Sequence, residues 1–316
     1  MTARILFLIM AVQALALSQS TSNLGGLPGS PLRMGFGAEG IGVGNALVAM
    51  RSNSVTGYYN PALLPFQGSP VAFASTSFLS LDRSLNFLSY SRHVEPSGGI
   101  SIGIINAGVT DIEERDSDGR RTGTVSTSEN AFLLSFGVQV DSRLSIGVSS
   151  KILYYHLYTD INSTTVGFDV GLAVVLSDEW TVGMSLQDLG SKYKWNTTEL
   201  YGINGNTTVD RFPLRKKLGI GYAALSIPLQ ASIETEHVAG ILFLRMGATF
   251  RVLDEFILRA GIDRLSPSGD GLPKPAFGFT AVQDIGSLAG FLSYAFVFEP
   301  YAPAGMHILS LGAEFR

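Results

Sequence analysis

Ionised side chains recur at alternate positions of several otherwise apolar segments in this 316-residue chain. If these segments pair as simple hairpins, Lys151 faces Asp169, and Arg245 lies between Glu234 and Asp263. Opposite charges on neighbouring strands attract one another across the ladder. We therefore predict cross-strand ion pairs, in which each carboxylate lies within about 6 Å of its cation. The chemistry expected of these residues is mutual neutralisation in a buried place rather than transport or catalysis.

Residue patterns typical of enzymes are few. The four His residues do not occur in the H-E-x-x-H spacing, and the chain has no Cys and no G-x-S-x-G turn. The run 234–237 (Glu-Thr-Glu-His) is better explained as a charged hairpin end than as a metal cluster. The run 116–119 (Asp-Ser-Asp-Gly) lacks the remaining ligands of a calcium loop and is expected to be a turn. We predict no enzyme activity, no metal site and no cofactor.

The composition narrows the classes of protein that remain. Lys and Arg number 22 and Asp and Glu number 26, so the net charge is −4. A nucleic-acid binder would carry a basic surplus, and none is predicted here. Only 15% of the residues are charged, below the usual quarter or so, while Gly is abundant with 36 residues. Soluble all-β proteins and membrane proteins both fit these values.

The first residues are typical of an export signal. Arg4 provides the positive start, residues 5–17 are apolar apart from Gln13, and small residues follow. About 13 apolar residues are too few for a helix to cross a hydrocarbon core, which disfavours a membrane anchor. We predict a cleaved signal peptide over residues 1–18, with the cut after Ala16-Leu17-Ser18 or, alternatively, after Ala14-Leu15-Ala16.

From residue 70 to residue 316, apolar residues alternate with small or polar ones. In the segment 132–140, for example, Phe132, Leu134 and Phe136 alternate with Leu133, Ser135 and Gly137. A period of two is the pattern of β-strands. About 14 such segments can be counted, at residues 70–80, 84–94, 98–109, 129–140, 143–158, 164–176, 180–188, 214–227, 228–237, 241–252, 255–264, 274–284, 287–298 and 306–316.

The connections between these segments differ by parity. Those after even-numbered segments are tight, as at 95–97 and 141–142, whereas several after odd-numbered segments are long, as at 110–128 and 189–213. An even number of strands with short turns at one end and long loops at the other is typical of outer-membrane barrels. We predict an all-β fold, an antiparallel transmembrane β-barrel in the bacterial outer membrane. Its apolar rows face lipid and its charges face inward; the alternative is a soluble β-sandwich adhesin.

Several motifs, in their order along the chain, resemble the PorV/PorQ family, which is itself similar to the FadL-type fatty-acid transporters. They are the Gly-rich run 37–49, the aromatic-Asn-Pro-Ala run 58–64, and shorter matches at 169–171, 188–190, 259–261, 294–296 and 307–312. The resemblance extends from about residue 35 to residue 316. It implies a barrel of 14 strands with the N-terminal segment folded inside as a hatch.

We accordingly expect a hatch segment at residues 19–69 and the barrel at 70–316, with one short helix over residues 41–50. A Gly- and Pro-rich stretch of this length exceeds an ordinary linker, and a wide barrel has a lumen to fill. Asn60, Pro61 and Ala62 would then form a rigid turn that anchors the hatch. The alternative for these three residues is an ordinary β-turn before the first strand.

The resemblance implies two functions. The first is a non-catalytic component of protein export or surface attachment, similar to type IX secretion, which holds secreted proteins or a secretion complex at its extracellular loops. The second is a passive transporter that takes hydrophobic small molecules past a hatch and through a lateral opening. In either case the outer-membrane lipid is a partner.

A lateral opening has a candidate place in the third strand. FadL-type proteins release apolar ligands through a kink in that strand, and here it contains Gly103, Asn106 and Gly108. Glycine weakens a strand and favours bulges. We expect a gap near residues 103–108; alternatively, the glycines only make room for hatch residues.

Overall fold

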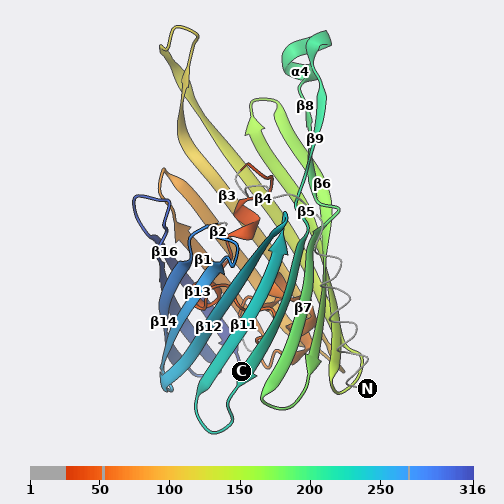
Figure 1. The fold of residues 1–316 in the computed structure, drawn as a ribbon, viewed down its shortest axis with the longest axis vertical. Helices are drawn as coiled ribbons and strands as arrows, with labels where there is room; N and C mark the ends of the chain where they lie inside the picture. Colours follow the sequence, from red (N-terminus) through yellow and green to blue (C-terminus); the bar gives the residue numbers. More distant parts are fainter. Residues whose placement is uncertain (1–25, 52–53, 270) are drawn as a thin grey trace.

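The computed structural model describes residues 26–51, 54–269 and 271–316, and the predicted signal peptide lies outside these ranges. The chain forms a closed antiparallel barrel of 14 strands in which β1 pairs with β16 (Figure 1). The barrel strands are β1 (Val71–Phe78), β2 (Arg83–Val94), β3 (Gly98–Arg115), β4 (Arg121–Gln139), β5 (Leu144–Tyr158), β6 (Ile161–Val175), β7 (Trp180–Leu189), β10 (Arg215–Ala223), β11 (Leu229–Val238), β12 (Ile241–Leu253), β13 (Phe256–Leu265), β14 (Lys274–Ile285), β15 (Leu288–Val297) and β16 (Met306–Phe315).

The remaining elements are short. A separate two-stranded sheet, made by β8 (Lys192–Asn196) and β9 (Thr207–Arg211), projects from one end of the barrel (Figure 1). The helical turns are η1 (Pro31–Arg33), α2 (Ala38–Gly42), α3 (Thr56–Tyr59), η2 (Pro61–Phe66), α4 (Thr198–Tyr201) and η3 (Gly202–Asn204). None of the helices within the described ranges is long and apolar enough to cross a membrane.

The wall has one apolar and one polar face, as the alternation predicts. Outward side chains such as Ile102 and Leu134 are 54% and 53% exposed, whereas their inward neighbours Ser101 and Ser135 are buried. A sandwich would bury the apolar rows between two sheets, but here they cover the outside of one closed sheet. The predicted barrel is confirmed, and the β-sandwich alternative is wrong.

Several predicted boundaries need correction. Most of the loop predicted at 110–128 is strand, because β3 and β4 continue as a long hairpin to Arg115 and Arg121. The loop predicted at 189–213 contains β8, α4 and β9. The strand predicted at 214–227 ends at Ala223, and a turn that contains Pro228 separates it from β11, since proline cannot donate to a ladder.

The helix predicted at residues 41–50 is also wrong. The structure has the single turn α2, which ends at Gly42. Gly44 and Asn45 follow with φ values of 63° and 61°. The left-handed conformation stops a right-handed helix, and glycine and asparagine are the residues that adopt it most readily.

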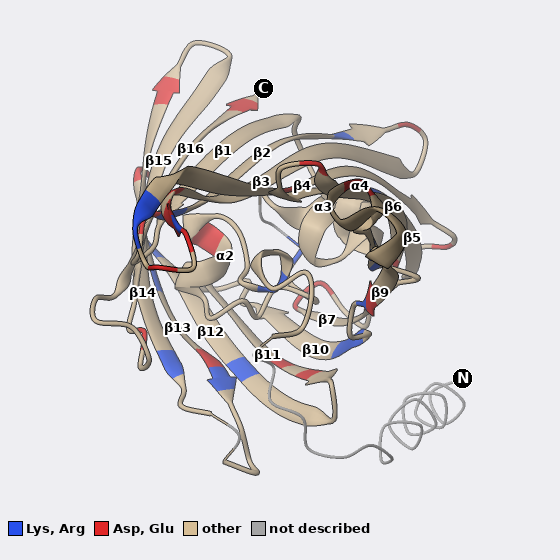
Figure 2. Ribbon diagram, turned by 90° about the horizontal axis from the view of Figure 1, so that it is seen from above, with Lys and Arg blue, Asp and Glu red and all other residues tan. Residues whose placement is uncertain are grey.

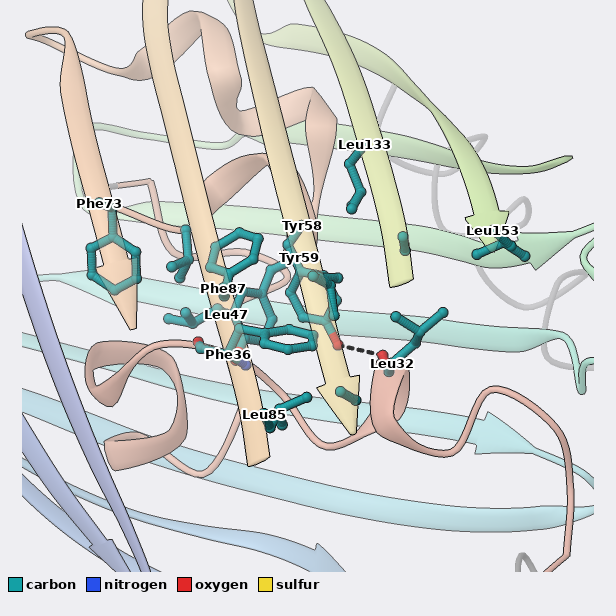
Figure 3. Packing of buried hydrophobic residues seen from close by; sticks show 14 of the residues in the cluster. Leu32, Phe36, Leu47, Tyr58, Tyr59, Phe73, Leu85, Phe87, Leu133 and Leu153 are labelled. Carbon is teal, nitrogen blue, oxygen red and sulfur yellow. Dashed lines mark hydrogen bonds between the residues drawn. The ribbon is translucent and has the colours of Figure 1, made fainter. Parts of the chain in front are cut away.

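Residues 26–51 and 54–70, here called the inner segment, lie within the ring of strands (Figure 2). Most of its side chains are buried, and Ala46, Val48 and Leu63 have no exposed surface. Its aromatic residues pack against β1 and β2, where Phe36 meets the Tyr58 ring edge-on at 4.7 Å (Figure 3). The Tyr58 hydroxyl donates a hydrogen bond of 2.7 Å to the Leu32 carbonyl, so the segment is also joined to itself (Figure 3).

A row of wall glycines faces the inner segment. Gly99, Gly137, Gly147 and Gly171 are successive partners across β3, β4, β5 and β6. A Cβ on Gly147 would lie 2.4 Å from the Ala62 nitrogen, which is closer than two such atoms can approach. Equivalent clashes with the backbone of the inner segment would arise further round the wall, at Gly183, Gly221, Gly247 and Gly261. The missing side chains therefore create the space that the inner segment occupies.

The glycine row generates a first prediction. Replacing Gly147 by Val puts atoms where the backbone of Pro61 and Ala62 now lies, and overpacking of this kind costs about 1–3 kcal/mol. We expect a lower unfolding temperature and faster tryptic cleavage after Arg51. Gly290→Val is the matched control, because the nearest atom to its added Cβ is 3.8 Å away. Equal stability of the two variants would contradict the account.

Candidate functional site

The β3–β4 hairpin and the β8–β9 sheet project from one end of the barrel, here called the upper end (Figure 1). This end contains a cavity of about 420 Å³. We call it the mouth pocket. Three parts of the chain line it: the start of the inner segment, the turn after β1 with the upper parts of β2–β5, and the β8–β9 sheet. Its apolar lining includes Leu27, Leu79, Leu85, Ala107 and Leu157. Most of its wall thus offers apolar surface, with a few polar groups between.

Aromatic rings form one side of the mouth pocket. Tyr155 of β5 contacts Tyr193 and Trp195 of β8, with ring centroids 5.2 and 5.3 Å apart. Tyr193 also meets Phe212 edge-on at 4.9 Å. Rings at these distances and angles stabilise each other beyond their simple burial. The aromatic wall therefore joins the projecting sheet to the barrel.

Hydrogen bonds fix the β8–β9 sheet over the lumen. Lys194 donates its backbone N–H to the Ser163 hydroxyl at 2.8 Å, and the Thr165 hydroxyl donates to the Lys192 carbonyl at 2.5 Å. Phe212, which follows β9, donates its backbone N–H to the Ser191 carbonyl at 3.0 Å. These bonds attach the sheet to β6 and close its base. The backbone that carries the rings of Tyr193 and Trp195 is therefore hydrogen-bonded to β6 and at the base of the β8–β9 sheet.

Polar groups in the mouth pocket are themselves bonded. The Tyr193 hydroxyl donates to Glu129 at 2.5 Å, and the Trp195 indole donates to Asp210 at 2.7 Å. Burial and the adjacent Glu129 carboxylate raise the pKa of Tyr193 well above its ordinary value, so its hydroxyl stays protonated. These carboxylates already have partners, and the surface left for a ligand is the flat faces of the rings.

Below the mouth pocket, two groups of buried charges lie on the inner wall. In the first, Lys151 contacts both Asp169 and Asp188, at 2.6 and 2.5 Å. Asp188 in turn donates its backbone N–H to Asp169 at 2.8 Å. All three side chains are almost fully buried. A buried charge without a partner costs several kcal/mol, so each member of this group depends on the others.

The second group is centred on Arg245. Its guanidinium contacts Glu234 at 3.0 Å, Asp263 at 2.5 Å and also Glu236. Arg215 pairs with Glu236 at 2.5 Å. The three carboxylates surround one guanidinium, which has five N–H donors to share among them. Lys217, 3.7 Å from Glu234, is the third cation, so three cations neutralise the three carboxylates within the lumen.

Both groups lie at irregularities of the wall. The β6–β7 ladder shifts register between Phe168 and Val170, which flank Asp169. The β12–β13 ladder shifts between Leu244 and Met246, which flank Arg245. A bulge places an extra residue opposite one partner and redirects its side chain. The bulges thus bring additional charges, such as Asp188, to the inner face.

The inner segment is bonded to these charges through its own polar groups. Asn45 donates to Asp263 at 3.0 Å, and the backbone N–H of Val48 donates to Glu234 at 3.0 Å. Asn60 donates to the Val48 carbonyl at 2.8 Å and to the Leu172 carbonyl at 3.2 Å. Backbone groups buried in a lumen need partners, and the charged wall supplies them.

The structure brings together the residues predicted as ion pairs, with one difference of register. Glu234 is directly opposite Arg245, and Asp263 lies in the facing bulge. Lys151 is opposite Gly167 rather than Asp169, and it reaches Asp169 diagonally. The prediction did not include Asp188 as a partner, because its inward position depends on the bulge.

Asn60, Pro61 and Ala62 lie inside the barrel, in contact with wall glycines. Asn60 is fully buried and accepts the Ala62 N–H at 3.1 Å, which caps η2. The side chain of Asn60 packs on Gly171, where a Cβ would be 2.0 Å from its oxygen. These residues therefore begin a short 3₁₀ helix at the wall rather than an ordinary turn before β1.

The predicted gap at Gly103, Asn106 and Gly108 is wrong. β3 pairs in continuous register with both β2 and β4 from Gly98 to Val109. Asn106 is an outward residue that donates to Asn130 at 2.7 Å, which reinforces the ladder. Glycine alone does not break a strand whose two neighbours are in place. At Gly99 of the same strand, the missing side chain makes room for Leu64.

One feature of the site, the pair of aromatic rings on β8, was not predicted. Tyr193 and Trp195 fell in a segment predicted as loop, although the alternation in Lys192–Asn196 is the signal of a short strand. Across the described ranges, no group of three His, Asp or Glu side chains is arranged to hold a metal ion.

Comparison with known proteins rests on structure. No family model matches the sequence, and no curated protein matches it. The fold is similar to that of the "CymD monoaromatic hydrocarbon channel", with a TM-score of 0.66 and 13% identity over 89% of this chain and 97% of that one. It is also similar to the toluene transporter TbuX of Ralstonia pickettii (TM-score 0.64, 12% identity, 89% and 98% covered). A FadL homologue from Pseudomonas aeruginosa has a TM-score of 0.59 at 10% identity, with 86% and 96% covered.

These similarities show that the chain shares the barrel architecture of FadL-type channels. The alignment covers 96–98% of each of these three proteins, so the shared part is the complete barrel rather than a local motif. At such low identity, the likeness extends to the fold and leaves the residues of the mouth pocket to be judged by their own chemistry.

The Arg245 group generates a second prediction. Arg245→Met leaves Glu234, Glu236 and Asp263 buried with less countercharge, and breaking a buried ion pair costs about 3–5 kcal/mol. Urea unfolding of the folded protein in lipid measures the loss. The control is Arg316→Gln, which removes an ion pair whose side chains are 51% and 59% exposed and costs about 0–1 kcal/mol. Equal effects would contradict the role given to Arg245.

Proposed function

We propose that this protein is a passive outer-membrane channel for hydrophobic small molecules, and that the mouth pocket captures them. The observation that carries the proposal is the aromatic and aliphatic wall of the mouth pocket, open at the upper end of the barrel. The free energy of an apolar ligand falls when it moves from water to such a wall. The flat faces of aromatic rings suit flat or chain-like molecules. A cavity of about 420 Å³ fits one small molecule.

The outward face of the barrel supports a membrane location. Exposed Leu, Ile, Val and Phe side chains cover it, whereas charged residues of the wall such as Lys151, Glu234 and Arg245 are buried inside. In water an apolar surface of this extent would aggregate, while in a bilayer it is matched to acyl chains. The proposal therefore places the barrel in the outer membrane, with its upper end, where the longest loops are, outward.

Structurally similar proteins support the choice of ligand. The structures similar to this chain include a monoaromatic hydrocarbon channel and a toluene transporter. Their ligands are apolar, as is the wall of the mouth pocket here. The first of the two predicted functions, a component of protein export that resembles PorV or PorQ, rests on sequence motifs alone, and the similar structures favour the second, a passive transporter.

Passage through the barrel requires a change in the inner segment. Val48, Asn60 and Leu63 are buried between the mouth pocket and the opposite end of the lumen, and they are hydrogen-bonded to or packed on the wall. The unbroken ladder of β3 closes the sideways route expected there. We propose that a captured molecule proceeds when part of the inner segment leaves the wall.

A flux assay tests the capture step. The double variant Tyr155→Ala/Trp195→Ala removes two rings from the mouth pocket, and we expect uptake of radiolabelled toluene into proteoliposomes to fall about tenfold. Tyr201→Ala is the matched control, because Tyr201 is 63% exposed at the tip beyond β8 and outside the pocket. Unchanged toluene flux in the double variant, with folding intact, would refute the role of the mouth pocket.

A further inference from the structure

The opposite, lower end of the lumen contains a second cavity of about 320 Å³, here called the lower cavity. It is bounded by the inner segment above and by the lower parts of β10–β16 and β1 around it. Its charged lining is Arg51, Arg251, Arg259, Arg316, Glu39 and Glu314, which is four cations and two anions. Phe66, Ile257 and Phe291 provide apolar surface beside them. The lower cavity therefore combines a net positive charge with apolar surface.

Arg259 is held rigidly within the lower cavity. Its side chain is 8% exposed, and it donates to the Thr280 hydroxyl, which is itself bonded to Ser293 at 2.7 Å. Its nearest carboxylate, Glu39 of α2, is 3.8 Å away, a loose contact for an ion pair. The backbone N–H of Ser54 also donates to Glu39, at 3.2 Å, so that carboxylate is shared. Arg259 thus keeps donor capacity directed at the cavity.

Arg251 lies beside Arg259 on the neighbouring strand. In the β12–β13 register, Thr249 is opposite Arg259 and Arg251 is opposite Ile257, so the two guanidinium groups are diagonal neighbours on the inner face. Within the described ranges, the Arg251 guanidinium has no hydrogen bond and no carboxylate within 4.0 Å. Arg51 donates to the Asp178 carbonyl and Arg316 pairs with Asp284, so these two are already engaged. Arg251 is the cation of the lower cavity without a partner.

We propose that the lower cavity binds a small organic carboxylate, with Arg251 and Arg259 on the carboxylate and Phe66, Ile257 and Phe291 on its apolar part. Two neighbouring guanidinium groups can bind the same anion together, and each can form a pair of hydrogen bonds with a carboxylate. Glu39 offsets the charge of Arg259, and Asp284 offsets that of Arg316. Arg51 and Arg251 against Glu314 then leave one positive charge, which a singly charged ligand fits better than a doubly charged phosphate. The apolar side chains would be left wet by an inorganic ion and are covered by an organic one.

This binding site stands apart from the mouth pocket and does not depend on passage between the two. Calorimetric titration of the full chain in detergent tests it, with benzoate as the probe. Benzyl alcohol serves as a neutral probe of similar size, and inorganic phosphate as a competitor. We expect Arg251→Gln to weaken benzoate binding about tenfold. Benzyl alcohol is expected to bind the native chain at least tenfold more weakly than benzoate.

Arg143→Gln is the matched control, because Arg143 is an exposed Arg in the β4–β5 turn at the same end and does not line the lower cavity. Equal benzoate affinity in native and Arg251→Gln protein would overturn the proposal, as would equal competition by phosphate. Arg251→Lys is expected to bind benzoate with intermediate affinity. This variant keeps the positive charge but loses the paired N–H donors of the guanidinium, so it separates the two contributions. The titration measures binding at the lower cavity without any flux, so failure here is distinguishable from failure of the mouth pocket, which the toluene flux assay reports.

Discussion

The lumen of a 14-strand barrel is wider than its own side chains can fill, and a chain that enters it must satisfy its backbone there. This constraint accounts for the main features of the wall. Where the inner segment approaches most closely, the wall has glycines such as Gly147 and Gly171. Where the segment presents N–H groups or amides, the wall has Glu234 and Asp263. Inner segment and barrel are therefore complementary in both shape and charge.

The same constraint explains why buried ions are retained in the lumen. An ion pair in a protein interior seldom adds net stability, since both partners lose their hydration. Here Glu234 is bonded to Arg245 and also to the Val48 N–H, and Asp263 joins Arg245 to Asn45. Each carboxylate thus connects the wall to the inner segment. The ions determine where the segment lies, with the mouth pocket on one side of it and the lower cavity on the other.

Much of the fold could be predicted from the sequence, because a period of two is a local signal and 14 repeats of it leave few architectures. The pairing of Arg245 with Glu234 follows from counting along one hairpin. The inward turn of Asp188 could not be found in this way, since it depends on a bulge set by neighbouring strands. Tyr193 and Trp195 belong to a short strand whose pairing is outside the barrel. The prediction of a gap near Gly103 was wrong because glycine permits a break in a strand without causing one.

The central claim is that an apolar molecule binds among the rings at the upper end of the barrel, above an inner segment that fills the middle. A structure of the full protein soaked with bromobenzene tests this most directly, because bromine can be located by its anomalous scattering. The account predicts bromine in the mouth pocket, between Tyr155 and Trp195. Bromine found only on the outer, lipid-facing wall, with the mouth pocket filled by water, would contradict it.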